Sequence, residues 1–148
     1  ALAAEKADTG SSALLSGLRA QESARTNDAI AAYELALHHG DTSGVAANNL
    51  AWIYASRGVQ LDRALELANV ANKNKPEDPA VLDTLGYVLL KRRQYSESAT
   101  ILEHALELAH RPNGDHTIVA ALEEHLAEAY VRSGRPEAAA KLRQTQRQ

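Results

Sequence analysis

The chain has 148 residues, of which 45% are hydrophobic and 4% aromatic, with four prolines and no phenylalanine. This content of apolar residues excludes wholesale disorder, and the abundance of alanine and leucine favours helices over a β-sandwich or barrel. Lysine and arginine number 16 against 19 aspartates and glutamates, and neither half of the chain is basic, so nucleic acid is not an expected partner.

Turn-forming residues divide the first half of the chain into helical segments. The Ala-rich residues 1–7 predict the end of an earlier helix, and Asp8–Ser12 predicts a loop with several N-cap residues. Four further helices are expected: 12–24, 28–39, one that ends near Gly58, and one from about Leu61 that ends before Pro76.

The second half predicts four more helices. Asp78 is a suitable N-cap and Pro79 a suitable first residue, so a helix is expected at about 79–92. Arg111–Gly114 is the strongest loop signal in the chain. The remaining helices are expected at 95–110, at 115–133, and from Pro136 into a frayed polar tail at 144–148.

One pattern occurs twice at a period near 34 residues. Leu50 and Leu85 are 35 residues apart, and Ala64 and Ser98 are 34 apart. A period of this length, with small residues at fixed positions, predicts stacked helical hairpins. We place four hairpins at about 10–43, 44–78, 79–112 and 113–148 in a single domain, 1–148. A start without methionine predicts a fragment of a longer chain.

These repeats resemble the tetratricopeptide repeat family, whose hairpin carries large and small residues at set intervals. The third hairpin matches best, through Leu82, Leu85, Gly86, Leu89, Tyr95, Ser98, Leu102 and Ala105. The others match less fully, through Leu50, Ala51, Tyr54, Ala64 and Pro76, through Leu126, Ala127, Tyr130 and Ala139, and through Gly17, Ala20, Ala29 and Tyr33. The resemblance implies an all-α, right-handed superhelical solenoid of about four hairpins, similar to bacterial arrays.

Small residues are expected where the two helices of a hairpin come closest. Ala51, Gly86 and Ala127 occupy matching positions, and a larger side chain there would push the helices beyond a packing distance of about 8–10 Å. We therefore expect these three positions to be tightly packed.

The fourth hairpin departs from the period. Leu85 and Leu126 are 41 residues apart, so seven extra residues fall around 111–119. We expect a loop at Pro112–Gly114, followed by a helix that begins early at Asp115. This insertion leaves the stacking of the fourth hairpin open.

In the family, the first helix of each hairpin lines a concave groove. The resemblance therefore implies partner-binding residues at Asn48, Asn49, Trp52, Asp83, Thr84, Tyr87, Lys91, Glu124, His125, Glu128 and Arg132, with Leu14, Leu15 and Leu18 in the first hairpin. Trp52 and Tyr87 hold matching positions, and amphipathic aromatics beside Asn and Thr predict a peptide-binding strip. The alternative is that Trp52 packs between hairpins. An asparagine pair within a helix favours recognition.

Other chemistry is weakly represented. Some members of the family bind the carboxylate end of heat-shock chaperones through Lys, Asn and Arg residues, but only Asn49 matches here, so we do not expect that activity. The six histidines lack His-Glu-x-x-His spacing, so we read them as solvated and expect no metal. The run Lys91–Arg93 suits a solvated helix end, with anion or partner binding as the alternative.

The remaining exclusions concern catalysis and membranes. The chain has no cysteine, no Gly-x-Ser-x-Gly and no Gly-rich phosphate loop, so we expect neither an enzyme nor a cofactor. No apolar run approaches the roughly 20 residues that a membrane helix needs. We therefore expect no membrane insertion by this segment.

The sequence thus predicts a non-catalytic scaffold that binds a protein or peptide in a concave groove. The blocks Asn-Asn-Leu-Ala-Trp and Ala-Val-Leu-Asp-Thr-Leu-Gly-Tyr resemble those of bacterial envelope proteins that serve exopolysaccharide export and outer-membrane assembly. The alternative is a regulatory or oligomerisation domain of a larger enzyme or membrane protein, with self-association. The partner, the parent protein and the compartment, periplasm or cytoplasm, stay open.

Overall fold

The computed structural model describes the backbone of residues 2–145 and the side chains of residues 8–144. The helices are α1 (Leu2–Glu22), α2 (Thr26–His38), α3 (Val45–Arg57), α4 (Leu61–Asn74), α5 (Pro79–Lys91), α6 (Tyr95–Ala109), the 3₁₀ turn η1 (His116–Ile118), α7 (Val119–Arg132) and α8 (Pro136–Thr145). The described residues contain no β-strand, which confirms the all-α prediction. Of the tail predicted to fray, residues 146–148 lie outside the described part.

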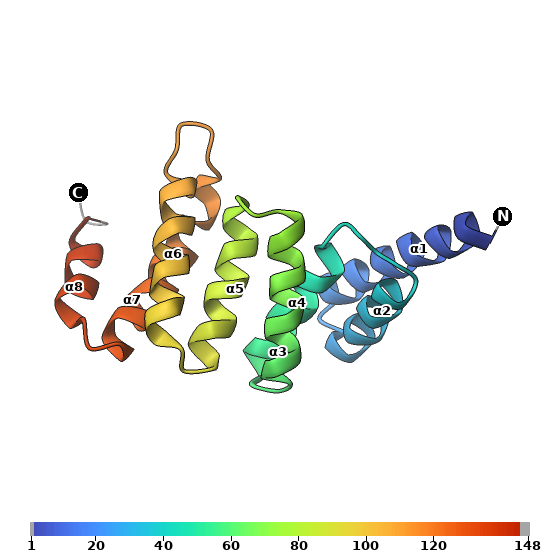
Figure 1. Ribbon diagram of the computed structural model, residues 1–148, viewed down its shortest axis with the longest axis horizontal. Coiled ribbons are helices and arrows are strands. Elements are labelled where there is room, and N and C mark those ends of the chain that lie inside the picture. The colour runs from blue at the N-terminus through green and yellow to red at the C-terminus, as the bar shows by residue number, and fades with distance from the viewer. Residues whose placement is uncertain (1, 146–148) are drawn as a thin grey trace. The chain divides into compact units, whose positions relative to one another are not determined.

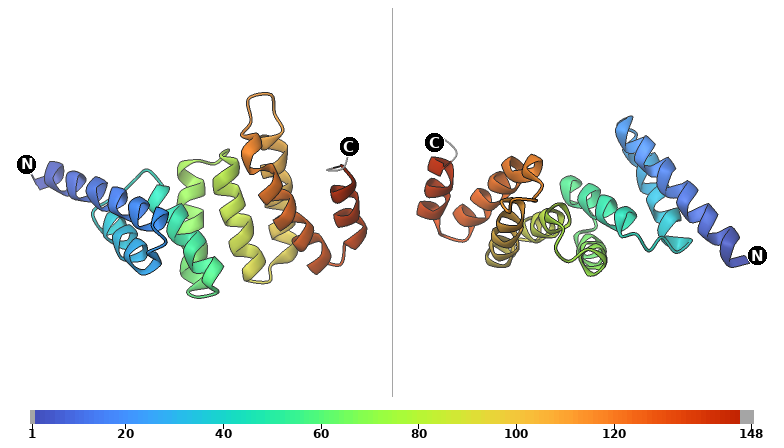
Figure 2. Two further views of the ribbon diagram at one scale, coloured as in Figure 1. Left: turned by 180° about the vertical axis from the view of Figure 1, so that it is seen from behind. Right: turned by 90° about the horizontal axis from the view of Figure 1, so that it is seen from above.

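The helices form two compact units of two hairpins each, residues 1–74 (unit 1) and 75–148 (unit 2). Unit 1 pairs α1 with α2 and α3 with α4, and unit 2 pairs α5 with α6 and α7 with α8 (Figures 1 and 2). The four predicted hairpins are therefore present. The single domain over 1–148 stays a prediction.

The predicted loop at Asp8–Ser12 is wrong, because α1 runs through it. Gly10 is buried, and a Cβ at this position would lie 3.3 Å from the carbonyl oxygen of His39. The missing side chain lets α1 continue along the end of α2. Local turn propensity therefore yields here to packing between the helices.

Most other helix ends follow the expected signals. Asp78 caps α5, since its Oδ1 accepts a hydrogen bond from the Ala80 N–H at 2.9 Å. Gly58 ends α3 with a φ of 65°, in the left-handed region that a glycine adopts without strain. α4 ends before Pro76, as expected from the restriction that proline places on the preceding residue.

In the first hairpin of each unit, a large side chain of the second helix packs directly against a glycine of the first helix. A Cβ at Gly17 would lie 2.5 Å from Cε1 of Tyr33, and one at Gly86 would lie 2.6 Å from Cγ of Leu102. The predicted close approach at Gly86 is confirmed. Ala51 and Ala127, which hold the matching positions in the second hairpins, are 0% and 5% exposed.

A tyrosine–glutamate hydrogen bond joins the two hairpins of each unit. In unit 1 the Tyr54 hydroxyl donates to Glu34 Oε1 at 3.1 Å, across 20 residues of sequence. In unit 2 the Tyr130 hydroxyl donates to Glu103 Oε1 at 2.8 Å, across 27 residues. The difference equals the seven inserted residues, so the insertion leaves this link between hairpins intact.

The insertion lies between α6 and α7 as a loop that extends beyond the end of α6 (Figure 1). The loop at 111–114 is confirmed, but the helix expected from Asp115 is wrong. Asp115 Oδ1 instead accepts from the Thr117 N–H at 3.0 Å and caps η1, and α7 begins only at Val119. A 3₁₀ turn absorbs the extra residues in place of added α-helical turns.

Candidate functional site

In unit 2 the face shared by α5 and α7 carries a close pair of polar side chains. His125 Nδ1 lies 2.7 Å from Asp83 Oδ1, and the side chains are only 13% and 7% exposed. Because a carboxylate accepts hydrogen bonds, Asp83 fixes the proton on Nδ1 of His125. The expectation of solvated histidines is wrong for His125, because the contact between α5 and α7 encloses it.

Two further predicted residues continue from this pair. The ring of Tyr87 lies against the imidazole of His125, with centroids 4.7 Å apart and planes tilted by 35°. The Nζ of Lys91 lies 5.1 Å from the centre of the Tyr87 ring, within cation–π distance. We name Asp83, Tyr87, Lys91 and His125 the α5/α7 cluster.

Charged side chains extend along α7 from the cluster. His125, Glu128 and Arg132 follow one another at helical spacings of three and four residues, so they share a stripe of α7. The Arg132 Nη2 donates to the Tyr95 hydroxyl at 2.7 Å, and this bond raises the pKa of Arg132. Glu124 and Glu128 are exposed.

The remaining predicted residue of α5, Thr84, and the predicted residues of α1 differ in exposure. Thr84 is 3% exposed, and its hydroxyl donates to the Ala80 carbonyl at 3.2 Å, within its own helix. Leu14 and Leu18 are half-buried, whereas Leu15 is 54% exposed. The Thr84 hydroxyl therefore bonds within α5, and the buried side chain exposes little surface to a ligand.

In unit 1 one member of the asparagine pair, Asn49, holds neighbouring helices together. The Asn49 Nδ2 donates to the Tyr33 hydroxyl at 3.1 Å, and that hydroxyl donates to Gln21 Oε1 at 2.6 Å. Burial raises the pKa of Tyr33, and the bond from Asn49 partly opposes this rise. Among the described residues the enclosed Oδ1 of Asn48 has no hydrogen-bond partner. The predicted recognition role of the pair stays untested, but Asn49 already has a partner within its own unit.

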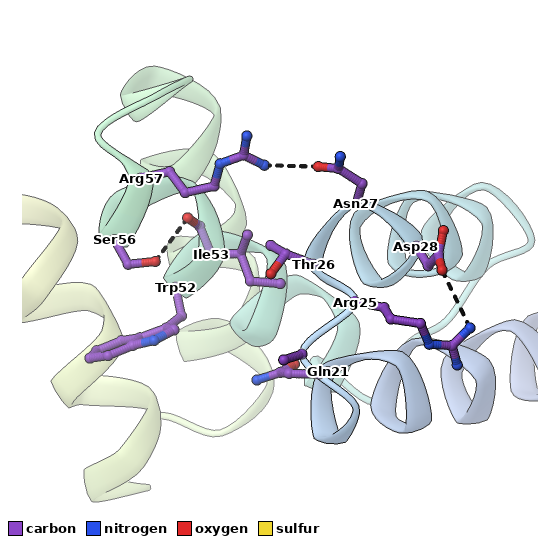
Figure 3. Close-up of a pocket in the computed structure, with 10 residues that line it drawn as sticks. Gln21, Arg25, Thr26, Asn27, Asp28, Trp52, Ile53, Ser56 and Arg57 are labelled. Atoms are coloured by element: carbon purple, nitrogen blue, oxygen red, sulfur yellow. Dashed lines mark hydrogen bonds and ion pairs between the residues drawn. The ribbon is translucent and has the colours of Figure 1, made fainter.

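Trp52 lines an open pocket of about 700 Å³ in unit 1 (Figure 3). Trp52, Ile53, Ser56 and Arg57 come from α3, and the opposite wall comes from the end of α1 and the start of α2. That wall consists of Gln21, Ala24, Arg25, Thr26, Asn27 and Asp28. Except for Trp52, none of these residues was expected from the sequence, because a wall built from a turn and a distant helix end leaves no periodic signal.

Two absences concern only the described residues. No three histidine, aspartate or glutamate side chains among them group as metal ligands would. None of the helices in the described part is long and apolar enough to cross a membrane.

Comparison with known proteins shows which family this arrangement of helices resembles. A family model described as tetratricopeptide repeat matches residues 77–144. A TPR repeat-containing protein of Pseudomonas aeruginosa is 31% identical over 82 residues, which cover 55% of this chain and 13% of that protein. The chain therefore spans a small part of the relative's length. Residues 77–144 therefore form a tetratricopeptide repeat region.

Solved structures share the tetratricopeptide repeat fold. A complex of the TPR2B domain of yeast Sti1 with pHsp70 has a TM-score of 0.73 at 14% identity, covering 84% of this chain and 98% of that one. MamA of AMB-1 has a TM-score of 0.67 at 22% identity, covering 89% and 68%. The TPR domain of Arabidopsis OM64 has a TM-score of 0.65 at 17% identity, covering 81% and 98%. Identities this low establish the fold alone, and tetratricopeptide repeat proteins are generally non-catalytic scaffolds that bind proteins or peptides.

Proposed function

We propose that this chain is a non-catalytic scaffold that binds a protein or peptide partner on the face formed by the first helices of its hairpins. In unit 2 that face is the α5/α7 cluster with the exposed Glu124, Glu128 and Arg132. In unit 1 it is the face of α3 that carries Asn48, Asn49 and Trp52. The observation that supports this proposal most is the order within the α5/α7 cluster.

The cluster offers a partner a fixed aromatic surface. The contact with His125 restrains Tyr87, and the 2.7 Å contact with Asp83 restrains His125 in turn. A side chain that is already ordered loses less conformational entropy when a partner binds, which leaves more of the contact energy for affinity. Lys91 and the charges of α7 surround this surface with both signs, which favours a polar peptide backbone with mixed side chains.

Asp83 and Thr84 take a supporting part in this proposal. Both are buried, and their polar atoms contact His125 and the α5 backbone. We therefore assign contact with the partner to Tyr87, Lys91 and His125, and assign to Asp83 the positioning of His125.

The test selects peptides from a displayed random library on the parent chain and measures their affinities by titration calorimetry. Tyr87→Ala should weaken the selected peptides at least tenfold, because aromatic anchors typically carry about 1–4 kcal/mol on truncation. Arg111→Ala, on the exposed loop of the same unit, should leave the affinity unchanged. Thermal melts first establish that both variants fold. Equal affinity of Tyr87→Ala and the parent chain would move the binding surface elsewhere.

The alternative function is a regulatory or oligomerisation domain of a larger protein. If the chain oligomerises through the α5/α7 cluster, its molecular mass in analytical ultracentrifugation should rise with protein concentration. The Tyr87→Ala variant should then stay monomeric, because it lacks an aromatic side chain of that surface. A monomer at all concentrations that still binds selected peptides favours the scaffold.

We carry the cellular context as a further part of the proposal. The Asn-Asn-Leu-Ala-Trp and Ala-Val-Leu-Asp-Thr-Leu-Gly-Tyr blocks favour envelope machinery for exopolysaccharide export or outer-membrane assembly. Cell fractionation of the full parent protein tests this context. Recovery in the cytoplasmic fraction alone would contradict it.

A further inference from the structure

The pocket of unit 1 has an apolar floor and a basic rim, and it is separate from the α5/α7 cluster. Ile53 is 5% exposed and Trp52 is half-buried, so these α3 side chains form the floor. Gln21 and residues 24–28 on one side, and Ser56 and Arg57 on the other, are exposed and form the rim. A volume of about 700 Å³ suits a few side chains of an extended peptide.

The charges of the rim favour a negatively charged ligand. Arg25 forms an ion pair with Asp28 at 3.3 Å, so these two charges largely offset each other. Arg57 Nη1 donates to Asn27 Oδ1 at 3.2 Å, which holds the guanidinium at the rim (Figure 3). The ion pairs of the described residues leave Arg57 without a carboxylate partner.

We propose that this pocket binds an acidic segment of a protein partner, with a carboxylate on Arg57 and a neighbouring apolar side chain against Trp52. A guanidinium has five N–H donors in a planar fork, and the bond to Asn27 uses one of them. The remaining donors suit a carboxylate bound through both oxygens. The apolar floor beside this cation favours an acidic residue that alternates with leucine or a similar side chain.

Trp52 gives this proposal a direct readout, because it is the only tryptophan of the chain. The probe is the blocked peptide acetyl-Glu-Leu-Glu-Leu-Glu-amide, and its neutral match is acetyl-Gln-Leu-Gln-Leu-Gln-amide. We expect the acidic peptide to change the Trp52 emission saturably and the neutral peptide to bind at least tenfold more weakly. The difference should shrink in 1 M salt, where exposed charges are screened beyond about 3 Å.

Matched variants locate the charge effect. Arg57→Gln should weaken the acidic peptide about fivefold, because a rim charge contributes modestly to affinity. Arg57→Lys should fall between the parent and Arg57→Gln, since it keeps the charge and loses the fork. Arg19→Gln removes the same charge from an exposed position of α1 outside the pocket and should leave the affinity unchanged.

The outcomes separate this pocket from the α5/α7 cluster. Tyr87→Ala should leave the acidic peptide bound as tightly as in the parent, whatever it does to peptides selected for the scaffold function. Equal binding of the acidic and neutral peptides would overturn the proposal. So would an Arg19→Gln loss as large as that of Arg57→Gln, or an emission that does not change up to millimolar peptide.

Discussion

The first hairpins of the two units place a glycine under a large side chain in the same way, but the side chains differ in chemistry. Sixteen residues separate Gly17 from Tyr33 and Gly86 from Leu102. In unit 1 the tyrosine hydroxyl bonds to Gln21 and Asn49, which ties α2 to both α1 and α3. In unit 2 the leucine lies in an apolar cluster.

Unit 2 has no tyrosine hydroxyl at this position, and the hydroxyl of Ser98 supplies the polar link instead. Ser98 is 0% exposed, and its Oγ donates to the carbonyl oxygen of Gly86 at 2.7 Å. This bond joins α6 to α5 at the same glycine that Leu102 covers. Both units therefore place a glycine where the two helices meet, and the polar link comes from Tyr33 in unit 1 and from Ser98 in unit 2.

The second hairpins agree more closely than the first. Both units attach the second hairpin to the first through a tyrosine that donates to a glutamate, Tyr54 to Glu34 and Tyr130 to Glu103. An arginine stands beside each glutamate, Arg63 at 3.9 Å and Arg135 at 3.3 Å. The link in unit 2 forms although seven inserted residues lie between its tyrosine and its glutamate. The two hairpins of each unit therefore pack in a way that brings these side chains together, whatever the length of the connection.

The largest expected effect comes from filling the glycine positions. Gly86→Leu should lower the free energy of unfolding by about 3 kcal/mol, because Leu102 is fully buried and has no space to withdraw. Urea denaturation followed by far-UV circular dichroism measures the loss. Stability equal to the parent would show that α5 and α6 can separate at this point.

A smaller substitution compares the two units directly. Alanine usually stabilises a helix by about 1 kcal/mol over glycine, so a loss reports a clash. Gly17→Ala should cost more than Gly86→Ala, because hydrogen bonds to Gln21 and Asn49 hold the Tyr33 ring in place, whereas no hydrogen bond holds the Leu102 side chain. The reverse order in urea denaturation would mean that the polar network is the more adaptable.

The next effect concerns the polar links themselves. Tyr33→Phe should cost about 1–2 kcal/mol and Ser98→Ala about 1 kcal/mol, since the first removes two hydrogen bonds and the second removes one. Asn49→Ala combined with Tyr33→Phe should cost less than the sum of the single changes. Additive costs in denaturant would separate Asn49 from the network and return it to the candidate partner-binding residues.

Residues with strong local preferences made much of the fold predictable. Asp78 before Pro79, Gly58 after α3 and the breaker Pro76 each act within one helical turn, and the structure places helix ends at all three. Gly10 and Ser11–Ser12 have equally strong turn preferences, yet α1 passes through them. The deciding factor there is the contact of Gly10 with the end of α2, which a local pattern does not contain.

The residues of the α5/α7 cluster were predicted from the sequence, but the contacts between α5 and α7 were not. Asp83 and Tyr87 lie one turn apart on α5, so their common face follows from helical spacing. Their contact with His125 spans 42 residues and depends on how the insertion is accommodated. One signal in the sequence did bear on this pairing. Tyr54 and Tyr130 are preceded by glutamates at corresponding positions of α2 and α6, which indicates that the fourth hairpin packs on the third as the second packs on the first.

The smallest expected effect distinguishes the two tyrosine–glutamate links by pH. Burial, and then the bond to Glu103, raises the pKa of Tyr130 to about 12, and the same causes raise the pKa of Tyr54 through Glu34. A raised tyrosine pKa means that the fold favours the neutral hydroxyl. This stabilisation is complete below about pH 10, the pKa of the unfolded chain, and is lost as the pH rises toward 12.

Phenylalanine variants isolate that loss from the other groups that titrate in alkali. The stability advantage of the parent over Tyr130→Phe should shrink by less than about 1 kcal/mol between pH 9 and pH 12, because Tyr130 is only partly buried and solvent screens the repulsion from Glu103. The advantage over Tyr54→Phe should shrink less, because only the Tyr130 shift is large. Denaturation in urea at several pH values measures both differences. An advantage over Tyr130→Phe that does not vary with pH would mean that the folded chain accommodates a tyrosinate without its hydrogen bond to Glu103, because Arg135, whose guanidinium lies 4.5 Å from the centre of the Tyr130 ring, offsets the negative charge.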